Sequence, residues 1–238
     1  MKNILLTGSD GFIGSNFVKY YRDEYQITNW GGVLPDFDVD LTSYDFVVHL
    51  AAEAGVRKSH KDPEGFWNVN VIGSMNVFNY CKDQNVPVIY ASSSSIYEWW
   101  QSPYATTKKV VETLAFEQES LGLRFHTVYG PNSRSDMLYD KLLKKDVEYL
   151  TNHTRDWTHV QDVANAIHVC IEKFDTIKHN KAVDIGTSKP VKVTDVANKL
   201  WPGNNLPVKT VTGEREHTRA YNGFGSMWQP LHHIMDDE

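Results

Sequence analysis

Residues 3–14 read Asn-Ile-Leu-Leu-Thr-Gly-Ser-Asp-Gly-Phe-Ile-Gly, and this stretch decides the fold. The apolar run 3–7 predicts a buried strand, the glycines predict a tight loop, and residues 12–21 have a helical pattern. Gly8 permits the turn, Gly11 lets backbone N–H groups approach a pyrophosphate, and Gly14 lets the helix lie close to the sheet. The spacing is Gly-x-x-Gly-x-x-Gly rather than the commoner Gly-x-Gly-x-x-Gly. The stretch favours a dinucleotide-binding turn, with a merely structural turn as the alternative.

Strands and helices alternate along the rest of the chain, which predicts an α/β fold. This alternation is typical of a Rossmann-type doubly wound parallel sheet, here followed by a small C-terminal substrate-binding α/β region. We expect a dinucleotide-binding domain over 1–128 and a substrate-binding region over 129–238, of which about 156–187 could return to the first domain. The expected strands are 25–28, 46–50, 86–91, 123–128, 182–185 and a short one ending at 39–41. The expected helices are 65–83, 102–121, 137–145, 160–174 and 194–200, with a loop at 155–157.

Three weak motifs follow predicted strands and should meet at one edge of the sheet. The glycine loop follows the first strand, Ala51-Ala52 follows strand 46–50, and the serine run 92–95 follows strand 86–91. Ligands of doubly wound sheets bind at the carboxyl ends of the strands. Small residues there leave room for a flat ligand, although ordinary tight packing explains Ala51-Ala52 equally well. The agreement in location makes the case for a nucleotide site.

The end of the second strand bears on the choice between NAD and NADP. An acid at this position would bind the adenosine ribose of NAD. Asn29 stands there, and its amide can still hydrogen-bond a ribose hydroxyl. No arginine follows to meet a 2′-phosphate, so NAD is favoured and NADP is not excluded.

The sequence Tyr104-Ala-Thr-Thr-Lys108 carries the chemistry. In a helix this spacing puts the phenol and the ammonium on one face, one turn apart. We expect the lysine charge to lower the pKa of the tyrosine. A serine of the run 92–95 can hydrogen-bond the same substrate oxygen, so the site should oxidise a hydroxyl group by moving its proton while hydride leaves elsewhere.

The composition of the chain limits the classes of protein to which it can belong. The chain has 238 residues with a net charge of −6 and 41% hydrophobic residues, which disfavours a nucleic-acid or membrane partner. We expect a cytoplasmic protein with no signal peptide and two reduced, buried thiols at Cys81 and Cys170. The histidines show no metal-ligand spacing, so we expect no metal site.

At this point the residues resemble a known family, the extended short-chain dehydrogenases/reductases of the NAD-dependent nucleotide-sugar epimerase/dehydratase group. The resemblance runs nearly from end to end and is closest to UDP-sugar 4-epimerases. The matching stretches, in order, are 7–14, 49–52, 54–59, 70–74, 92–97, 103–108, 124–131, 155–163, 184–186, 213–215 and 228–230.

The resemblance implies a mechanism and a set of site residues. Tyr104 would be the proton-transfer base, Lys108 would also hydrogen-bond the nicotinamide ribose, and Ser93 would be the catalytic hydroxyl. NAD would take hydride from sugar C4 and return it to the other face of the 4-keto sugar. The cofactor would lie against Gly8, Gly11, Phe12, Ile13, Gly14, Asn29, Asp40, Leu41, Leu50, Ala51, Ala52, Asn70, Ser92, Tyr104 and Lys108. The nucleotide sugar would contact Ser94, Thr127, Arg155 and Arg215.

Departures from the family pattern narrow the reaction. Family dehydratases carry Asp-Glu where this chain has Ser94-Ser95, and serine is a poor acid or base at neutral pH. Simple 4-epimerisation is therefore favoured. An NAD(P)H-dependent 4-keto-sugar reductase or a dehydratase is the alternative, and a non-catalytic NAD-binding protein is the alternative from another class.

The chain is also shorter than its family. Only six residues, 98–103, separate Tyr97 from Tyr104, where relatives have a long loop, and Thr127 replaces a substrate-contacting Asn. We hypothesise that Trp99 and Trp100 help to cover the sugar, with dimer or core packing as the alternative. The family commonly dimerises through two helices per subunit, here 65–83 and 102–121, so we expect a homodimer.

Overall fold

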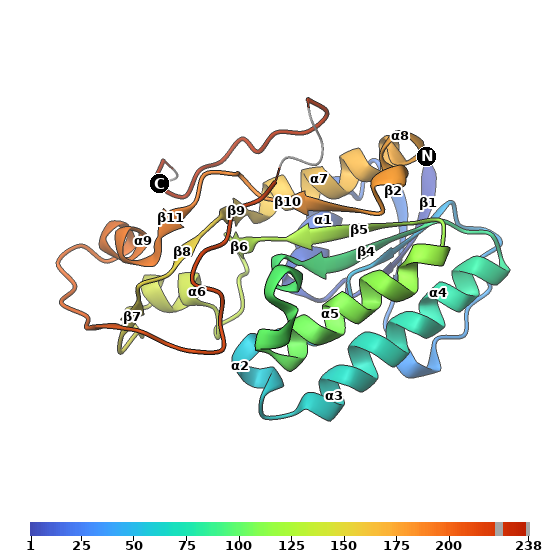
Figure 1. Ribbon diagram of the computed structural model, residues 1–238. Helices are drawn as coiled ribbons and strands as arrows, with labels where there is room; N and C mark the ends of the chain where they lie inside the picture. Colours follow the sequence, from blue (N-terminus) through green and yellow to red (C-terminus); the bar gives the residue numbers. More distant parts are fainter. Residues whose placement is uncertain (222–225, 237–238) are drawn as a thin grey trace.

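A six-stranded parallel sheet forms the centre of the molecule in the computed structural model, which describes residues 1–221 and 226–236 (Figure 1). The strand order is β10-β5-β4-β3-β1-β2, so the chain winds outward in both directions from β1 and β3. The strands are β1 (Lys2–Thr7), β2 (Tyr25–Trp30), β3 (Phe46–His49), β4 (Val88–Ser93), β5 (Ser120–Phe125) and β10 (Ala182–Ile185). This confirms the predicted doubly wound α/β fold.

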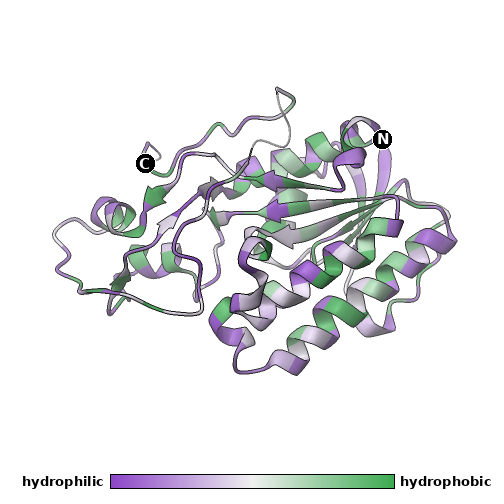
Figure 2. Ribbon diagram, viewed as in Figure 1, coloured by the Kyte–Doolittle hydropathy of each residue, from purple (hydrophilic) through white to green (hydrophobic). Residues whose placement is uncertain are grey.

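Helices cover both faces of this sheet. One face packs on α1 (Phe12–Tyr21) and α7 (Val160–Glu172), whose apolar side chains share one core with the sheet. The other face packs on α4 (Ser74–Asp83) and α5 (Pro103–Leu114), and this second core includes Val47 and Val88. Figure 2 shows hydrophobic and hydrophilic residues alternating along α4 and α5, as helices with one buried face require.

The helix expected at 65–83 exists, but it changes geometry in the middle. It comprises α3 (Pro63–Trp67), a π-helical stretch Asn68–Gly73, and α4. Such π-helical turns often occur at functional sites, and this one contains Asn70.

A smaller region lies beyond the carboxyl edge of the sheet. It contains α6 (Leu138–Leu143), α9 (Val193–Leu200) and a third apolar cluster that includes Trp157. Three short two-stranded sheets join its parts. In the first, β6 (Thr127–Tyr129) pairs with β9 (Trp157–His159). In the other two, β8 (Thr154–Arg155) pairs with β11 (Val191–Lys192), and β7 (Leu150–Thr151) pairs with β12 (Val208–Lys209). Helices α2 (Val56–Ser59) and α8 (Phe174–Ile177) complete the described α-helices, and 3-10 turns occur at Leu34–Asp36, Ser94–Gln101, Ala115–Glu117 and Lys178–Asn180. Because β10 pairs with β5, part of the chain after residue 129 belongs to the first sheet; the division into domains at 129 stays a prediction.

Several sequence-based expectations were wrong in detail. Residues 39–41 form no strand, because the 3-10 turn Leu34–Asp36 leads the chain inward and the Leu41 N–H bonds the Gln84 side chain instead of a neighbouring strand. Helix α5 ends at Leu114 rather than 121, since Ser120 pairs with Val88 to begin β5. The strand expected at 123–128 is two strands in different sheets, and the loop expected at 155–157 lies in β8 and β9.

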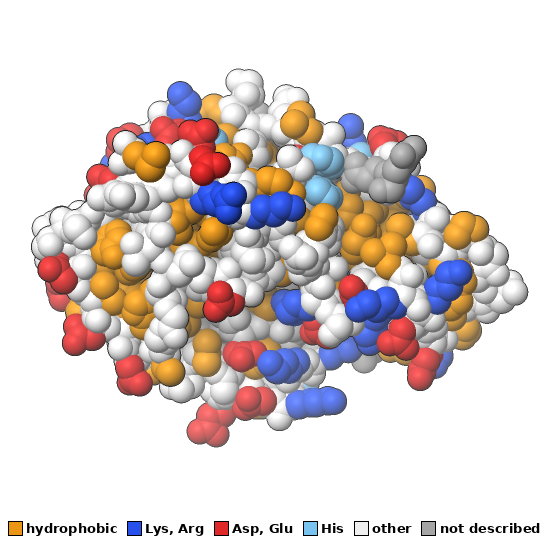
Figure 3. Space-filling model, turned by 180° about the vertical axis from the view of Figure 1, so that it is seen from behind, with side chains coloured by type: hydrophobic (Ala, Val, Ile, Leu, Met, Phe, Trp, Pro, Cys, Tyr) orange, Lys and Arg blue, Asp and Glu red, His pale blue; other side chains and the backbone are white. Residues whose placement is uncertain are grey.

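Surface charge is mixed on the face shown in Figure 3. Lys and Arg side chains are interspersed there with Asp and Glu, without the continuous basic stripe that nucleic acids require. Among the helices of the described residues, none is long and apolar enough to cross a bilayer.

The close packing of the glycine loop yields a first prediction. A Cβ on Gly14 would lie 2.1 Å from the Gly8 carbonyl oxygen, whereas a Cβ on Gly31 would meet no described atom within 4 Å. We expect Gly14→Ala to lower the free energy of unfolding by at least about 2 kcal/mol, the scale of overpacking in a rigid core. The matched control Gly31→Ala should change it by less than about 0.5 kcal/mol. Urea unfolding measures both, and equal effects of the two substitutions would contradict the account.

Candidate active site

The glycine loop forms one wall of the site at the carboxyl edge of the sheet. Gly8 has a φ of +75°, and a Cβ there would lie 2.6 Å from the Ala51 nitrogen, so only glycine fits. The Gly11 N–H donates to the Gly8 carbonyl over 3.1 Å, which closes the turn. Within residues 1–221 and 226–236, no side chain caps the first turn of α1. Its N–H groups and the positive end of the helix dipole are therefore suited to a pyrophosphate.

The opposite wall, residues 50–52, is held by a buried polar relay. The Thr7 hydroxyl lies 2.8 Å from His49 Nδ1 and accepts the Ala51 N–H over 3.2 Å. His49 Nε2 in turn lies 3.0 Å from the Ser74 hydroxyl on α4. Burial, together with the nearby Lys108 charge, lowers the pKa of His49 to about 3, so the imidazole is neutral at physiological pH.

Asn70 links this wall to the catalytic helix. Its side-chain amide accepts the Glu53 N–H over 2.8 Å and donates to the Glu53 carbonyl over 3.0 Å and the Thr107 hydroxyl over 3.1 Å. The side chain is fully buried, so the structure places it behind the cleft wall, where it fixes residues 52–53 against α5.

The expected catalytic residues come together. Tyr104 and Lys108 lie on successive turns of α5, and the Ser93 hydroxyl at the end of β4 is near enough to the Tyr104 phenol to influence its pKa. The Ser93 oxygen also accepts the Ser95 N–H over 3.1 Å, which leaves its own proton free for the phenol. Lys108 Nζ donates to the Ala91 carbonyl over 3.0 Å.

The electrostatics of this group differ from the expectation. Burial raises the pKa of Tyr104, whereas the hydrogen bond from Ser93 and the positive charge of Arg134 lower it. Lys108 does not supply this effect in the structure; burial lowers its own pKa to about 8. Sequence reasoning missed Arg134 because it lies in a loop, 30 positions from Tyr104, where no periodic pattern points to the site.

The structure brings the expected substrate arginines to the same side of the cleft. Arg155 is mostly buried, which lowers its pKa to about 10, and its guanidinium contacts His153 Nδ1 at 2.6 Å. Arg215 donates to the Ser94 carbonyl over 2.6 Å and to Glu98 over 3.2 Å. Segment 210–217 thus reaches over the serine run.

The ion pairs of Glu214 connect this segment to the cleft. Its carboxylate binds Arg57 at 2.7 Å and lies 3.9 Å from Arg155. A cavity of about 400 Å³ lies beside this ion pair, between α2 and residues 210–214. Thr127 is half-buried at the start of β6, where its N–H bonds the Asp156 carbonyl.

The contacts of the other expected cofactor residues with NAD stay predictions, and their surroundings differ. The Ser92 hydroxyl points to Glu112 on α5, at 2.5 Å, and Leu41 is fully buried in the second core. Asn29 is exposed at the end of β2, and Asp40 is exposed with its carboxylate bound to Thr42. Phe12 is buried and Ile13 half-buried on α1, while Leu50, Ala51 and Ala52 are half-buried. Phe12 and Ile13 pack against the first core.

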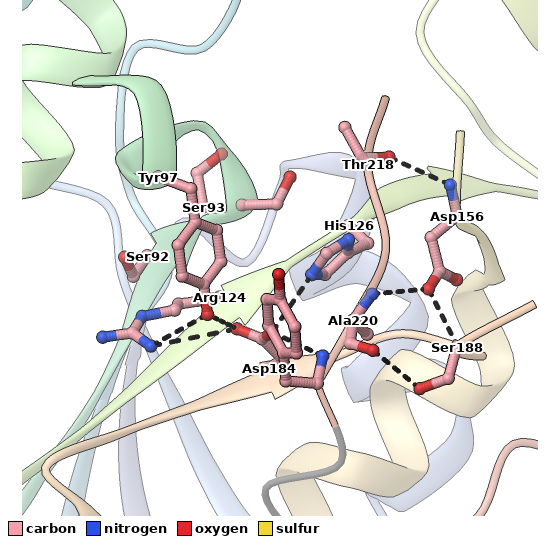
Figure 4. Close-up of polar contacts among 12 residues, drawn as sticks. Ser92, Ser93, Tyr97, Arg124, His126, Asp156, Asp184, Ser188, Thr218 and Ala220 are labelled. Carbon is pink, nitrogen blue, oxygen red and sulfur yellow. Dashed lines mark hydrogen bonds and ion pairs between the residues drawn. The ribbon is translucent and has the colours of Figure 1, made fainter. Parts of the chain in front are cut away.

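A polar network behind the serine run was not expected from the sequence (Figure 4). Arg124 on β5 donates to the Tyr97 hydroxyl over 3.1 Å, and Tyr97 donates to Asp184 on β10 over 2.8 Å. His126 Nε2 lies 3.6 Å from the same Asp184 carboxylate. Arg124 lies on β5, Asp184 on the neighbouring β10, and Tyr97 in the 3-10 segment Ser94–Gln101 after β4, so the folded sheet brings together residues that are far apart in the sequence.

A second buried carboxylate, Asp156, anchors the segment that crosses the site. It accepts N–H groups from Thr187 at 2.7 Å, Ser188 at 2.9 Å and Ala220 at 2.8 Å. Figure 4 shows Ser188, from the loop after β10, and Ala220, from the C-terminal segment, beside Asp156. The end of the segment that carries Arg215 is thereby fixed.

The remaining expectations concern tryptophans, thiols and metals. Trp99 and Trp100 are 44% and 66% exposed, which excludes core packing but leaves a role at the sugar untested. Cys81 and Cys170 are buried free thiols, as expected. The described residues contain no cluster of three or more His, Cys, Asp or Glu that could hold a metal.

Comparisons with known proteins agree with this architecture. The model of the NAD dependent epimerase/dehydratase family matches residues 38–186. Protein CapI of Staphylococcus aureus is 33% identical, over 87% of this chain and 79% of that protein. UDP-glucuronate 4-epimerase 2 of Arabidopsis thaliana is 28% identical. The alignment covers 83% of this chain and 63% of the plant protein.

Among solved structures, UDP-glucuronic acid 4-epimerase from Bacillus cereus, in complex with UDP-glucuronic acid and NAD, superposes with a TM-score of 0.84. It is 25% identical, with 98% of this chain and 96% of that chain covered. The chain belongs to the NAD dependent epimerase/dehydratase family. Its cofactor is NAD, which the glycine loop and the uncapped α1 N-terminus are suited to hold.

The buried neutral His49 yields a prediction on stability. Its folded-state pKa lies below the unfolded value of 6.5, so the stabilisation is complete above pH 6.5 and is lost as the pH falls. Between pH 6.5 and 5 the free energy of unfolding should fall by about 2 kcal/mol relative to His49→Gln, at about 1.4 kcal/mol per pH unit. Urea titrations of both proteins measure the difference. A pH-independent difference would show that His49 is not a buried neutral imidazole.

Proposed function

We propose that the protein is an NAD-dependent nucleotide-sugar 4-epimerase that acts on a UDP-sugar. The observation that carries the proposal is that Tyr104 and Lys108 on α5 and Ser93 at the end of β4 lie together at the edge of the sheet where the glycine loop lies. A phenol that is polarised by a serine hydroxyl and a nearby arginine can exchange a proton with a sugar hydroxyl.

In this mechanism each residue has a separate task. NAD, when bound, supplies the oxidising and reducing capacity by accepting a hydride and giving it back. Tyr104 takes the proton from the sugar 4-hydroxyl and later returns it, while the Ser93 hydroxyl hydrogen-bonds both partners. Lys108, whose ammonium donates to the Ala91 carbonyl, would hold the nicotinamide ribose. The 4-keto sugar must turn in the site between the two transfers for the configuration to invert.

The serine run supports epimerisation over the alternatives. Elimination of water across C5 and C6 needs an acid and a base beside the catalytic hydroxyl, and those positions hold Ser94 and Ser95. The Ser94 carbonyl is taken by Arg215, and the Ser95 N–H is taken by Ser93. Neither side chain is an effective proton donor or acceptor at neutral pH.

A uronic acid is the sugar that the site favours. The Arg134 guanidinium lies near Tyr104, where its charge opposes the effect of burial on the Tyr104 pKa. Its side chain is 46% exposed and pairs with exposed Asp136 at 3.0 Å, a weak surface ion pair that a sugar carboxylate can replace. Several relatives are UDP-glucuronate 4-epimerases, including the structure from Bacillus cereus. UDP-glucuronate is therefore the first substrate to test.

The purified protein should interconvert UDP-glucuronate and UDP-galacturonate with no added cofactor, followed by NMR of the product. Tyr104→Phe should reduce kcat by about 100- to 10,000-fold, the usual contribution of general acid–base catalysis. The control Tyr139→Phe changes a phenol outside the proposed site and should retain activity. Stoichiometric consumption of NAD(P)H would instead identify a 4-keto-sugar reductase, and loss of water from the product a dehydratase. A cellular role that survives Tyr104→Phe would favour a non-catalytic NAD-binding protein.

We also propose a homodimer formed by α4 and α5, the outer layer on one side of the sheet in Figure 1. Trp67 at the start of this layer is 44% exposed, and Phe116 just after α5 is 60% exposed, so apolar surface is available to a second copy. Light scattering at micromolar concentration should give twice the 27.2 kDa mass of one chain. A monomer at that concentration would contradict the proposal.

A further inference from the structure

Three side chains on successive turns of α5 face the carboxyl ends of the strands. Tyr104, Lys108 and Glu112 are spaced four apart and therefore lie on one face of the helix. Each has a polar neighbour on β4: Tyr104 lies near Ser93, Lys108 donates to the Ala91 carbonyl over 3.0 Å, and Glu112 accepts from Ser92 over 2.5 Å. The proposed function uses the first two and leaves Glu112 without a role.

Glu112 carries a negative charge into a buried place. Its side chain is only 8% exposed, and a buried carboxylate is costly unless it is fully paired. Arg124 on β5 supplies the pairing, because its Nε and Nη2 each donate to one carboxylate oxygen over 2.9 Å. This two-point contact is the strongest arrangement between these groups.

Lys108 is the competing partner. A lysine and a glutamate four residues apart on one helix face are normally within reach of each other. In the described part of the chain, however, Lys108 has no ion pair, and burial lowers its pKa to about 8. The titratable groups around Lys108 and Glu112 are His49 on β3, Tyr90 on β4, and Tyr104 on α5. None of them is an acid that could take the place of Glu112.

Arg124 is itself fixed from the other side. It donates to the Tyr97 hydroxyl over 3.1 Å and lies 3.9 Å from Asp184, as Figure 4 shows. Its guanidinium therefore stays beside Glu112 rather than turning into the cleft.

We propose that Arg124 is a positioning residue that holds the Glu112 carboxylate away from Lys108, so that the ammonium stays directed at the cleft. The proposal rests on the proposed function, in which Lys108 holds the nicotinamide ribose. Without Arg124, the buried carboxylate has two lysines within one helical turn, Lys108 and Lys109. It pairs with Lys108, because Lys108 is buried beside it whereas Lys109 is exposed. Lys108 then leaves the Ala91 carbonyl, and its pKa rises because a negative charge favours the ammonium form.

The test follows the Lys108 titration in the holoenzyme by NMR of ¹³Cε-labelled lysine, with the signal assigned by its loss in Lys108→Met. Arg124→Gln should raise the midpoint by at least about one pH unit, the usual effect of a close opposite charge. Glu112→Gln should leave the midpoint near the wild-type value, and the double variant should return to it. The control Lys144→Gln removes an exposed ion pair with Asp140 and should change nothing.

Activity provides a second readout. Arg124→Gln should lower kcat about tenfold, and adding Glu112→Gln should restore part of that loss, which a purely structural role would not produce. If Arg124→Gln does not fold, Arg124→Lys keeps the charge and should leave the Lys108 midpoint near that of the wild type.

An unchanged midpoint in Arg124→Gln, or a double variant that remains shifted, would overturn the proposal. A raised midpoint in Arg124→Lys would do the same. A failure of the proposed function is distinguishable, because the wild type would then lack epimerase activity while the Lys108 titration could still be measured.

Discussion

The docking of α5 on the carboxyl ends of β4 and β5 is the interaction on which the site depends. Interdigitated apolar side chains hold a helix against a sheet, and polar contacts with defined directions fix its register further. Here polar side chains on three turns of α5 each have one partner on β4, so the helix has a single register. The same contacts set the distance between the phenol of Tyr104 and the hydroxyl of Ser93.

The cofactor side of the cleft is fixed by different means. Glycines at positions 8 and 14 allow a backbone approach that any side chain would prevent. Residues 50–53 are then held by the Thr7–His49–Ser74 relay and by Asn70, all buried. Both walls are therefore rigid, whereas the segment that carries Arg215 crosses the site through ion pairs that are partly exposed.

The parts that could be predicted from the sequence are those with local signals. The glycine spacing after a buried strand and the Tyr104–Lys108 spacing each fix geometry over a few residues, and both lie at the expected edge. The strand predicted to end at 39–41 was wrong, because an alternating apolar pattern suits a strand, whereas Leu41 reaches the core from a turn. Arg134 and the Glu112–Arg124 pair could not be found, because they depend on which strands and loops become neighbours. The orientation of Ser92 could not be predicted either. Ser92 and Ser93 are adjacent in the sequence, and only the folded structure shows that the Ser92 hydroxyl bonds Glu112 while Ser93 lies near Tyr104.

The central claim is that hydride leaves sugar C4 and returns to the same carbon, while Tyr104 moves the proton. Incubation of UDP-glucuronate deuterated at C4, followed by NMR and mass spectrometry of the sugar, tests it most directly. The account predicts inverted configuration at C4 with the deuterium retained at that carbon. Loss of the deuterium to solvent, or inversion at another carbon, would contradict it.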